Sequence, residues 1–154
     1  MTKSKVNNGV QLPCPAEELV PHRPPMLLID ELISRQAERA TATALIPESG
    51  ICLEPDQGVL PEFFIEVIAQ TMAAVNGYDA RLAGKSPRDG FLVGIDDFSF
   101  VAHPQPGSPL RIEVEKNFEF GAVKIIHGQV FGPDDLLLAS GTIKVWEEVD
   151  PEEG

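Results

Sequence analysis

The stretch PEFFIEVIAQTMAAV, residues 61 to 75, predicts the central helix of the fold. Proline is favoured at the first position of a helix, and Glu62 beside it suits the positive end of the helix dipole. The apolar residues cover nearly the whole circumference, which indicates burial on most sides. Gly77 or Gly84 marks the expected end of the helix. We therefore expect one long helix surrounded by a sheet.

The sheet is predicted from extended patterns on both sides of this helix. In LRIEVEKNFEF, residues 110 to 120, apolar and polar residues alternate with period two, which is typical of a strand with one solvated face. Similar extended runs occupy residues 26–34, 38–46, 90–103, 122–131 and 136–146. No second helix of comparable length is visible, so a two-layer ferredoxin-like domain is disfavoured. The pattern indicates an α+β fold with a single dominant helix.

Length and composition predict one domain over residues 1–154, because 43% hydrophobic and 23% charged residues are typical of globular chains. The proline-rich residues 1–20 are expected to form an arm with a short helix around PAEELV. The acidic residues 147–154 are expected to be a frayed tail. Residues 47–60 contain two prolines and two glycines and predict a long ordered loop, a kind of segment that is often functional.

The formal net charge of −12 disfavours nucleic acid and anionic membrane surfaces as partners. No apolar segment approaches the roughly 18 residues that cross a bilayer, and the N-terminus lacks the apolar part of a signal peptide. We therefore expect a cytoplasmic protein. Cys14 and Cys52 match no CxxC or zinc spacing, so neither a disulfide nor a metal site is expected.

An ionisable group lies within the most apolar run of the chain. Glu62, Glu66 and Gln70 are spaced four residues apart, so on a helix they form one polar stripe. An unpaired carboxylate in low dielectric costs several kcal/mol, so Glu66 is expected to be paired, protonated or facing a cavity. One alternative is a salt bridge to an arginine or simple exposure. The other is a carboxyl group that exchanges a proton with a substrate.

Histidines are the natural partners for such an acid, and the chain has His22, His103 and His127. His22 is the best candidate because its proline-flanked segment would hold an imidazole in place at low entropic cost. Gly58 and Pro61 place a flexible loop against the helix N-terminus, where backbone N–H groups can polarise a carbonyl oxygen. An ordinary helix start explains them equally well. Phosphate-loop, GxSxG and HExxH motifs are absent.

Three stretches occur in the order and at the spacing found in one enzyme family. PHRPPMLLIDEL (residues 21–32) is similar to that family's PHRxPxLLxDRV strand entry, and IEVIAQTMA (65–73) is similar to its IEAMAQ helix. GFLVGIDDFSFVAHPQPGSPLRIEVE (90–115) is similar to its return strands. Together these stretches resemble the 3-hydroxyacyl-[acyl-carrier-protein] dehydratases of the FabZ and FabA type.

The resemblance implies a hot-dog fold, in which a curved antiparallel sheet wraps around one long central helix. It implies dehydration of a 3-hydroxyacyl thioester, carried by acyl carrier protein or coenzyme A, to the trans-2-enoyl thioester in fatty-acid or polyketide-type synthesis, without a cofactor. It also implies a homodimer or higher oligomer joined through sheet edges. In this family the carboxylic acid at the position of Glu66 protonates the departing hydroxyl, and a glutamine stands at the position of Gln70. Gly58, Pro61 and Gln70 are therefore the candidate substrate-binding residues.

The chain departs from the family at the catalytic histidine, whose position is taken by Cys52, and at a loop glycine replaced by Pro61. This altered pattern is similar to a dehydratase-like branch found with aryl-polyene and related gene sets. In one interpretation His22 replaces the lost base and Glu66 remains the acid. In another the chain is a catalytically weak subunit that binds acyl chains or pairs as a heterodimer with an active dehydratase. A hot-dog acyl thioesterase, in which Glu66 activates water, is the third.

Overall fold

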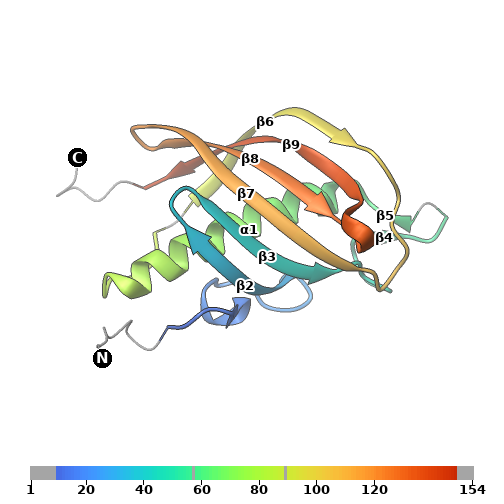
Figure 1. Cartoon of the computed structure of the whole chain (residues 1–154), viewed down its shortest axis with the longest axis horizontal. Coiled ribbons are helices and arrows are strands. Elements are labelled where there is room, and N and C mark those ends of the chain that lie inside the picture. Colours follow the sequence, from blue (N-terminus) through green and yellow to red (C-terminus); the bar gives the residue numbers. More distant parts are fainter. Residues whose placement is uncertain (1–9, 57, 89, 149–154) are drawn as a thin grey trace.

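One antiparallel sheet and one long helix make up the structure, a computed structural model that describes residues 10–56, 58–88 and 90–148 (Figure 1). The sheet has seven strands in the order β1-β2-β3-β7-β8-β9-β6. Its strands are β1 Cys14–Pro15, β2 Ile29–Gln36, β3 Arg39–Leu45, β6 Gly90–Phe100, β7 Pro109–Phe120, β8 Val123–Phe131 and β9 Leu137–Glu147. The helix, α1, spans Glu62–Leu82. This arrangement confirms the predicted α+β class.

The helix begins and ends where the sequence indicates. Pro61 precedes its first residue, and the helix continues through Gly77 and stops at Leu82. Gly84, two residues further on, has a φ of 70°, a conformation that glycine adopts at little cost after a helix end. Of the two expected ends, the second is therefore the correct one.

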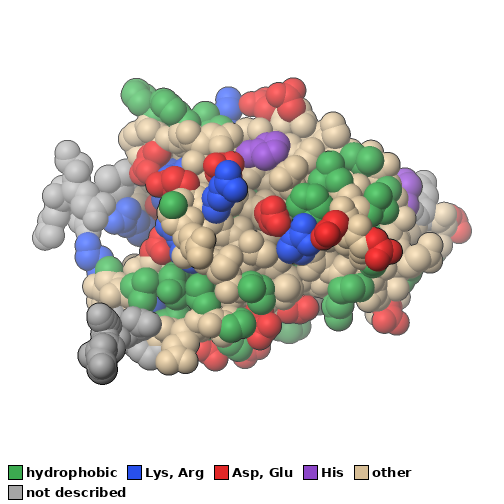
Figure 2. Space-filling model, in the orientation of Figure 1, with side chains coloured by type: hydrophobic (Ala, Val, Ile, Leu, Met, Phe, Trp, Pro, Cys, Tyr) green, Lys and Arg blue, Asp and Glu red, His purple; other side chains and the backbone are tan. Residues whose placement is uncertain are grey.

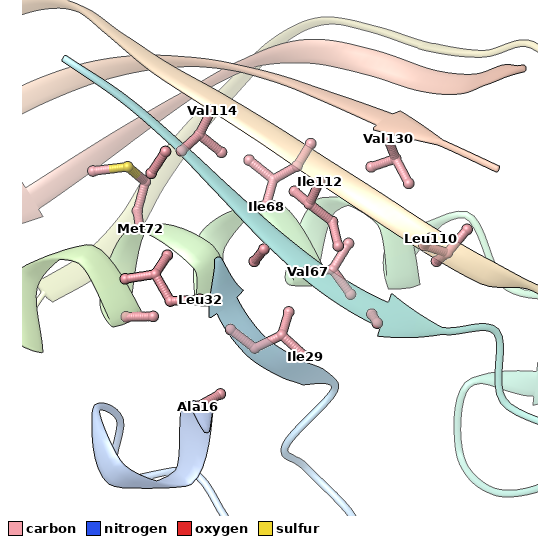
Figure 3. Close-up of a cluster of buried hydrophobic side chains, with 14 of the residues drawn as sticks. Ala16, Ile29, Leu32, Val67, Ile68, Met72, Leu110, Ile112, Val114 and Val130 are labelled. Carbon is pink, nitrogen blue, oxygen red and sulfur yellow. The ribbon is translucent and has the colours of Figure 1, made fainter. Parts of the chain in front are cut away.

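The core lies between α1 and the inner face of the sheet (Figure 3). Val67, Ile68 and Met72 project from the helix towards β2, β3, β7 and β8, whose buried side chains include Leu32 and Ile112. At Gly128 the strand β8 comes so close that a Cβ atom there would lie 2.6 Å from Ile68. The wide apolar surface of α1 thus fits a sheet that curves around it, as expected.

The N-terminal arm is part of the packed structure from Val10 onward. Strand β1 pairs with β2, and the expected short helix in the PAEELV segment is a single 3₁₀ turn, η1 (Ala16–Glu18). Its residues Ala16 and Leu19 are buried. A Cβ atom at Gly77 would lie 2.0 Å from the backbone oxygen of Leu19, so the arm touches the backbone of α1. Residues 1–9 of the predicted arm lie outside the described residues.

The structure adds detail to the predicted loop of residues 47–60 and to the predicted C-terminal tail. The long loop of residues 47–60 contains a small hairpin of β4 (Leu53–Glu54) and β5 (Gly58–Val59). Strand β9 runs to Glu147, which is buried and accepts a 2.6 Å hydrogen bond from Lys124 Nζ. The predicted tail therefore begins one residue inside the sheet, and its residues 149–154 lie outside the described residues. A second 3₁₀ turn, η2 (Pro133–Asp135), joins β8 to β9.

No helix in the described part of the chain has the length and apolar content needed to cross a membrane.

Replacing Gly77 by alanine is expected to lower the free energy of unfolding by about 1–3 kcal/mol, the usual cost of overpacking. Helix propensity alone predicts the opposite sign, a gain of about 1 kcal/mol, so the sign separates the two effects. Urea denaturation followed by circular dichroism measures it. Gly90→Ala is the matched control, because its Cβ would lie at an ordinary 3.5 Å from the Trp146 oxygen. A more stable Gly77→Ala variant would contradict the close approach of the arm.

Candidate active site

Gln70 is a buried amide that fastens the strand-entry segment to the helix. Its side chain has no solvent exposure, and its Oε1 accepts a 2.9 Å hydrogen bond from the Leu28 amide. Its Nε2 donates to the Met26 oxygen at 2.8 Å and to Glu66 Oε2 at 2.9 Å. A backbone N–H only donates and a backbone oxygen only accepts, so the orientation of the Gln70 amide is unambiguous. Glu66 therefore faces the NH₂ group of Gln70.

Glu66 lies one helical turn before Gln70 and is half-buried. Its Oε2 receives the Gln70 bond, while Oε1 has no hydrogen-bond partner among the described residues. No lysine or arginine of the described ranges forms an ion pair with it, so the expected alternative of a salt bridge to an arginine is wrong for this part of the chain. One oxygen is thus held in place and the other is available to carry a proton.

His22 lies four residues before Met26 in the same segment. The segment is tightly turned, since the Met26 and Leu27 amides both donate to the Arg23 oxygen. The ring is partly exposed, but its Nδ1 atom is buried and has no hydrogen-bond partner among the described residues. No described hydrogen bond joins His22 to Glu66. The structure therefore brings the His22 segment to the helix through Gln70 without pairing the two candidate catalytic groups.

Cys52 lies close to the acidic start of the helix. Burial raises the pKa of the Cys52 thiol, and the negative charges of Glu66 and then Glu62 raise it further. A thiol with a raised pKa stays protonated at neutral pH and is a poor base. Cys52 therefore shares the electrostatic surroundings of Glu66 but does not supply the missing proton acceptor.

The loop before the helix offers fewer free amides than the sequence suggests. Pro61 has no N–H, the Leu60 amide donates to the Cys52 oxygen at 2.8 Å, and the Phe63 amide donates back to Leu60 at 3.0 Å. Gly58 has a φ of 81°, and nothing within 4 Å would meet a Cβ there, so its glycine is required by backbone conformation and not by a close neighbour. The amides of Leu60 and Phe63 can polarise a substrate carbonyl only if these hydrogen bonds are first broken.

A pocket of about 290 Å³ opens beside Cys52. Its apolar lining residues come from the strand-entry segment, the loop of residues 47–60 and the helix start: Pro25, Leu27, Leu28, Leu45, Pro47, Ile51 and Phe63. Polar atoms, among them those of Asp30 and Ser49, contribute at least as much of the exposed lining as apolar atoms do. Glu66, Gln70 and His22 are not among the lining residues, so the pocket adjoins the candidate site without containing it.

The other two histidines lie away from this region. His127 is on β8 between the inward-facing Ile126 and Gly128, so it points to the outer face of the sheet. His103 follows β6 and is exposed. Within the described ranges, no three His, Cys, Asp or Glu side chains come together as metal ligands.

Comparison with known proteins assigns this arrangement to a family. The family model described as ApeP dehydratase matches residues 14–153. The chain belongs to the ApeP-like dehydratases. Its enzyme class is therefore that of the hydro-lyases. The 3-hydroxyacyl-[acyl-carrier-protein] dehydratase FabZ of Anaeromyxobacter dehalogenans strain 2CP-C is 32% identical over 116 residues, 70% of this chain and 72% of that protein. FabZ of Clostridium perfringens strain SM101 is 29% identical over 140 residues, 81% and 95% of the two chains.

Solved structures agree on the fold. A chain of the dehydratase heterocomplex ApeI:P from Xenorhabdus doucetiae superposes with a TM-score of 0.78 at 19% identity, over 91% of this chain and 95% of that one. The PaaI protein of the E. coli phenylacetic acid degradation operon gives a TM-score of 0.61 at 12% identity, over 79% and 80%. The ApeP-like chain therefore has the hot-dog fold that the sequence motifs implied.

The hydrogen-bond partners of Gln70 are the part of the site that the sequence predicts least well. The place of Gln70 in the ApeP-like helix is apparent from the motif, but two of its three hydrogen bonds, to Met26 and Leu28, join segments more than forty residues apart. No local sequence pattern predicts these long-range hydrogen bonds. The structure thus gives Gln70 a positioning contact with Glu66, in place of a free amide directed to substrate.

Alkylation of Cys52 by iodoacetamide, followed by peptide mass spectrometry, tests the charge environment. Glu66→Gln removes the larger of the two negative influences, so the thiol pKa falls and more thiolate is present at a given pH. We expect the rate at Cys52 to rise measurably at pH 7–8, because the thiolate is the reactive form. Glu62→Gln should give a smaller rise. Equal rates in wild type and both variants would mean that Cys52 lies outside the field of these carboxylates.

Proposed function

We propose that the protein dehydrates 3-hydroxyacyl thioesters of acyl carrier protein or coenzyme A to trans-2-enoyl thioesters, in fatty-acid or polyketide-type synthesis. The observation that carries this proposal is the buried amide of Gln70, which holds one oxygen of Glu66 and leaves the other available. The family and the FabZ relatives support the same reaction class. The pocket beside Cys52 is proposed to take part of the acyl thioester.

In this reaction Glu66 is the acid. The Gln70 NH₂ donates to Oε2, so the proton of the neutral carboxyl group is carried on Oε1. That proton passes to the 3-hydroxyl as the C–O bond breaks, and water leaves. A base removes the α-proton, and the electron pair of that C–H bond becomes the new double bond. The two protein groups exchange protons in opposite directions, so no other reactant is consumed.

His22 is proposed as that base. Its segment is fixed against the helix by Gln70, and its buried Nδ1 makes no described hydrogen bond that would compete for a proton. The neutral, high-pKa thiol of Cys52 supports the same assignment by exclusion. Gly58 and Pro61 are proposed to line the path of the thioester by van der Waals contact, since Pro61 has no N–H and the neighbouring Leu60 and Phe63 amides are engaged.

A partner chain is proposed at β6. This strand is an edge of the sheet, and an unpaired edge is a template for pairing with another strand. It exposes Phe91, Leu92, Val93, Ile95 and Phe100. The partner is a second copy in a homodimer or, as in the ApeI:P heterocomplex, a different dehydratase chain. In a heterodimer this chain could be the weaker catalyst.

Glu66→Gln is expected to reduce dehydration at least 100-fold, because a neutral carboxamide keeps the Gln70 bond but is a very poor proton donor. The purified protein is incubated with 3-hydroxyacyl and with 2-enoyl thioesters, and the absorbance of the conjugated enoyl group is followed in both directions. Glu62→Gln, one turn earlier on the exposed side, is the control and should retain activity. Full turnover by Glu66→Gln would exclude it as the acid.

The same assay separates the alternatives. Thioesterase structures share this fold at low identity, and a carboxylate can activate water. Release of free thiol, followed with a thiol reagent, would indicate a thioesterase in place of a dehydratase. An inactive but folded protein that gains activity when mixed with a second dehydratase chain would indicate the partner-subunit role.

His22→Gln is expected to lower kcat by 100-fold or more with little change in KM, since an amide of similar reach cannot accept the α-proton. His103→Gln should behave as wild type. If His22→Gln is fully active and Cys52→Ser is not, the base is at the position of the family histidine after all.

A further inference from the structure

An irregularity in β7 reverses which side chains point outward at the end of the β7–β8 hairpin. Lys116 pairs with Ile126, but Phe118 pairs with Ile125, so Asn117 is one extra residue on β7. Such a bulge shifts the alternation of a strand by one residue. Even-numbered residues up to Lys116 face the helix side with Ile112 and Val114, whereas Phe118 and Phe120 after the bulge face away from it.

The register of the neighbouring strands places more aromatic residues beside them. Phe120 is opposite Val123, Val123 is opposite Trp146, and Trp146 is opposite Phe91. Residues paired in this way share one face of the sheet. Four rings on the face away from α1 thus form the outer aromatic patch: Phe91, Phe118, Phe120 and Trp146. Figure 2 shows hydrophobic side chains at the end of the sheet where the β7–β8 hairpin turns, and charged ones towards the middle.

The patch is as large as the apolar patches that are often functional. Phe120 is 74% exposed, Phe91 57%, Phe118 55% and Trp146 38%. At about 200 Å² for each ring, these fractions leave roughly 450 Å² in water, which is the size of the largest apolar patch on a typical monomer. Elsewhere on this face the strands carry ordinary polar residues, such as Thr41, Glu113 and Gln129. The clustered exposed aromatic residues of this face therefore lie at one end, whereas Leu45 and Leu136 are exposed singly elsewhere.

The patch of one copy is complementary in shape to the same patch of a second copy. Phe118 and Phe120 stack on β7 with ring centroids 6.5 Å apart, and Phe91 and Trp146 stack on the far side at 5.9 Å. Between these two ridges lies β8, whose outward side chains Val123 and Ile125 are smaller. A two-fold axis can place the Phe118–Phe120 ridge of one copy in the Val123–Ile125 trough of the other, the isologous contact most common in homo-oligomers.

We infer that the outer aromatic patch is the docking surface for a second copy of this chain. Two copies would bury roughly 900 Å² from the rings alone, and the flanking Val123 and Ile125 bring the total to the size of a specific interface, about 1,000 Å² or more. The patch itself holds no ionised group, and its neighbour Lys144 is within 3.6 Å of Asp96, so little charge is buried. A lipid surface fits less well, because the chain carries a net charge of −12.

This contact lies on the outer face of the sheet and shares only Phe91 with the proposed pairing at the β6 edge, and it does not depend on the proposed dehydration. With β6 pairing the protein is a dimer of dimers, and without it the protein is a dimer through the patch. In both cases, substitutions that disrupt the patch are expected to halve the mass of the assembly. Trp146 is the only tryptophan of the chain, so its fluorescence reports on the patch alone.

Sedimentation velocity of the full chain and of Phe118→Ser/Phe120→Ser tests the inference. We expect the double variant to have half the mass of the wild type, and Leu45→Ser/Leu136→Ser, which changes two leucines that are each 53% exposed elsewhere, to keep the wild-type mass. Trp146 emission should move to shorter wavelength as the wild-type concentration rises, and should not move in the Phe118→Ser/Phe120→Ser variant.

Three results would overturn the inference. One is an equal mass for the wild type and the Phe118→Ser/Phe120→Ser variant. Another is Trp146 emission that is independent of protein concentration although the mass changes. The third is an emission shift that appears only when phosphatidylcholine vesicles are added, which would make the patch a lipid contact. The enoyl absorbance assay is unaffected by any of these, so failure here and failure of the proposed reaction are distinguishable.

Discussion

The amide of Gln70 is the interaction on which the candidate site depends. It lies at the centre of the molecule with no access to water, so each of its three hydrogen bonds replaces one that solvent would otherwise make. Two of them fix the backbone at Met26 and Leu28, and the third fixes Glu66. The course of the chain into β2 and the orientation of a half-buried carboxyl group are therefore set by one side chain. A substitution that keeps the volume but loses the amide leaves buried backbone groups unpaired, which costs about 1–3 kcal/mol for each.

The carboxyl groups near the two ends of α1 differ in whether a basic side chain is paired with them. At the C-terminal end Asp79 pairs with Arg35 at 2.9 Å, and the buried Glu147 pairs with Lys124. At the N-terminal end Glu66 is held only by the neutral amide of Gln70 among the described residues. The carboxyl groups near the first end are thus compensated by basic side chains, whereas Glu66 has no described cation beside it.

The sequence was sufficient for the helix, the long strands and their antiparallel arrangement, because those depend on local periodicity and on Pro61 and Gly84 at the helix boundaries. It was not sufficient for features that depend on contacts between distant segments. The 3₁₀ turn at Ala16–Glu18 forms where the arm meets Gly77, and no local signal distinguishes it from a short α-helix. Glu66 and Gln70 were identified by their motif. The occupation of the Leu60 and Phe63 amides, which weakens the expected roles of Gly58 and Pro61, is visible only once the loop is folded.

The extra residue at Asn117 shows how little a sequence must change to alter the surface of such a sheet. The hairpin turn at Gly121, where φ is 60°, closes with the same two strands whichever side chains face outward. Phe118 and Phe120 face outward because the bulge at Asn117 places Phe118 opposite the outward-facing Ile125. If Asn117 instead paired with Ile125 in a regular ladder, Phe118 and Phe120 would alternate to the inner face. The register of β7 against β8, and not the composition of β7 alone, thus decides whether this end of the sheet exposes aromatic side chains. In relatives of this chain, an added residue that removes or moves the bulge would change the outer surface of the hairpin without any substitution of its aromatic residues.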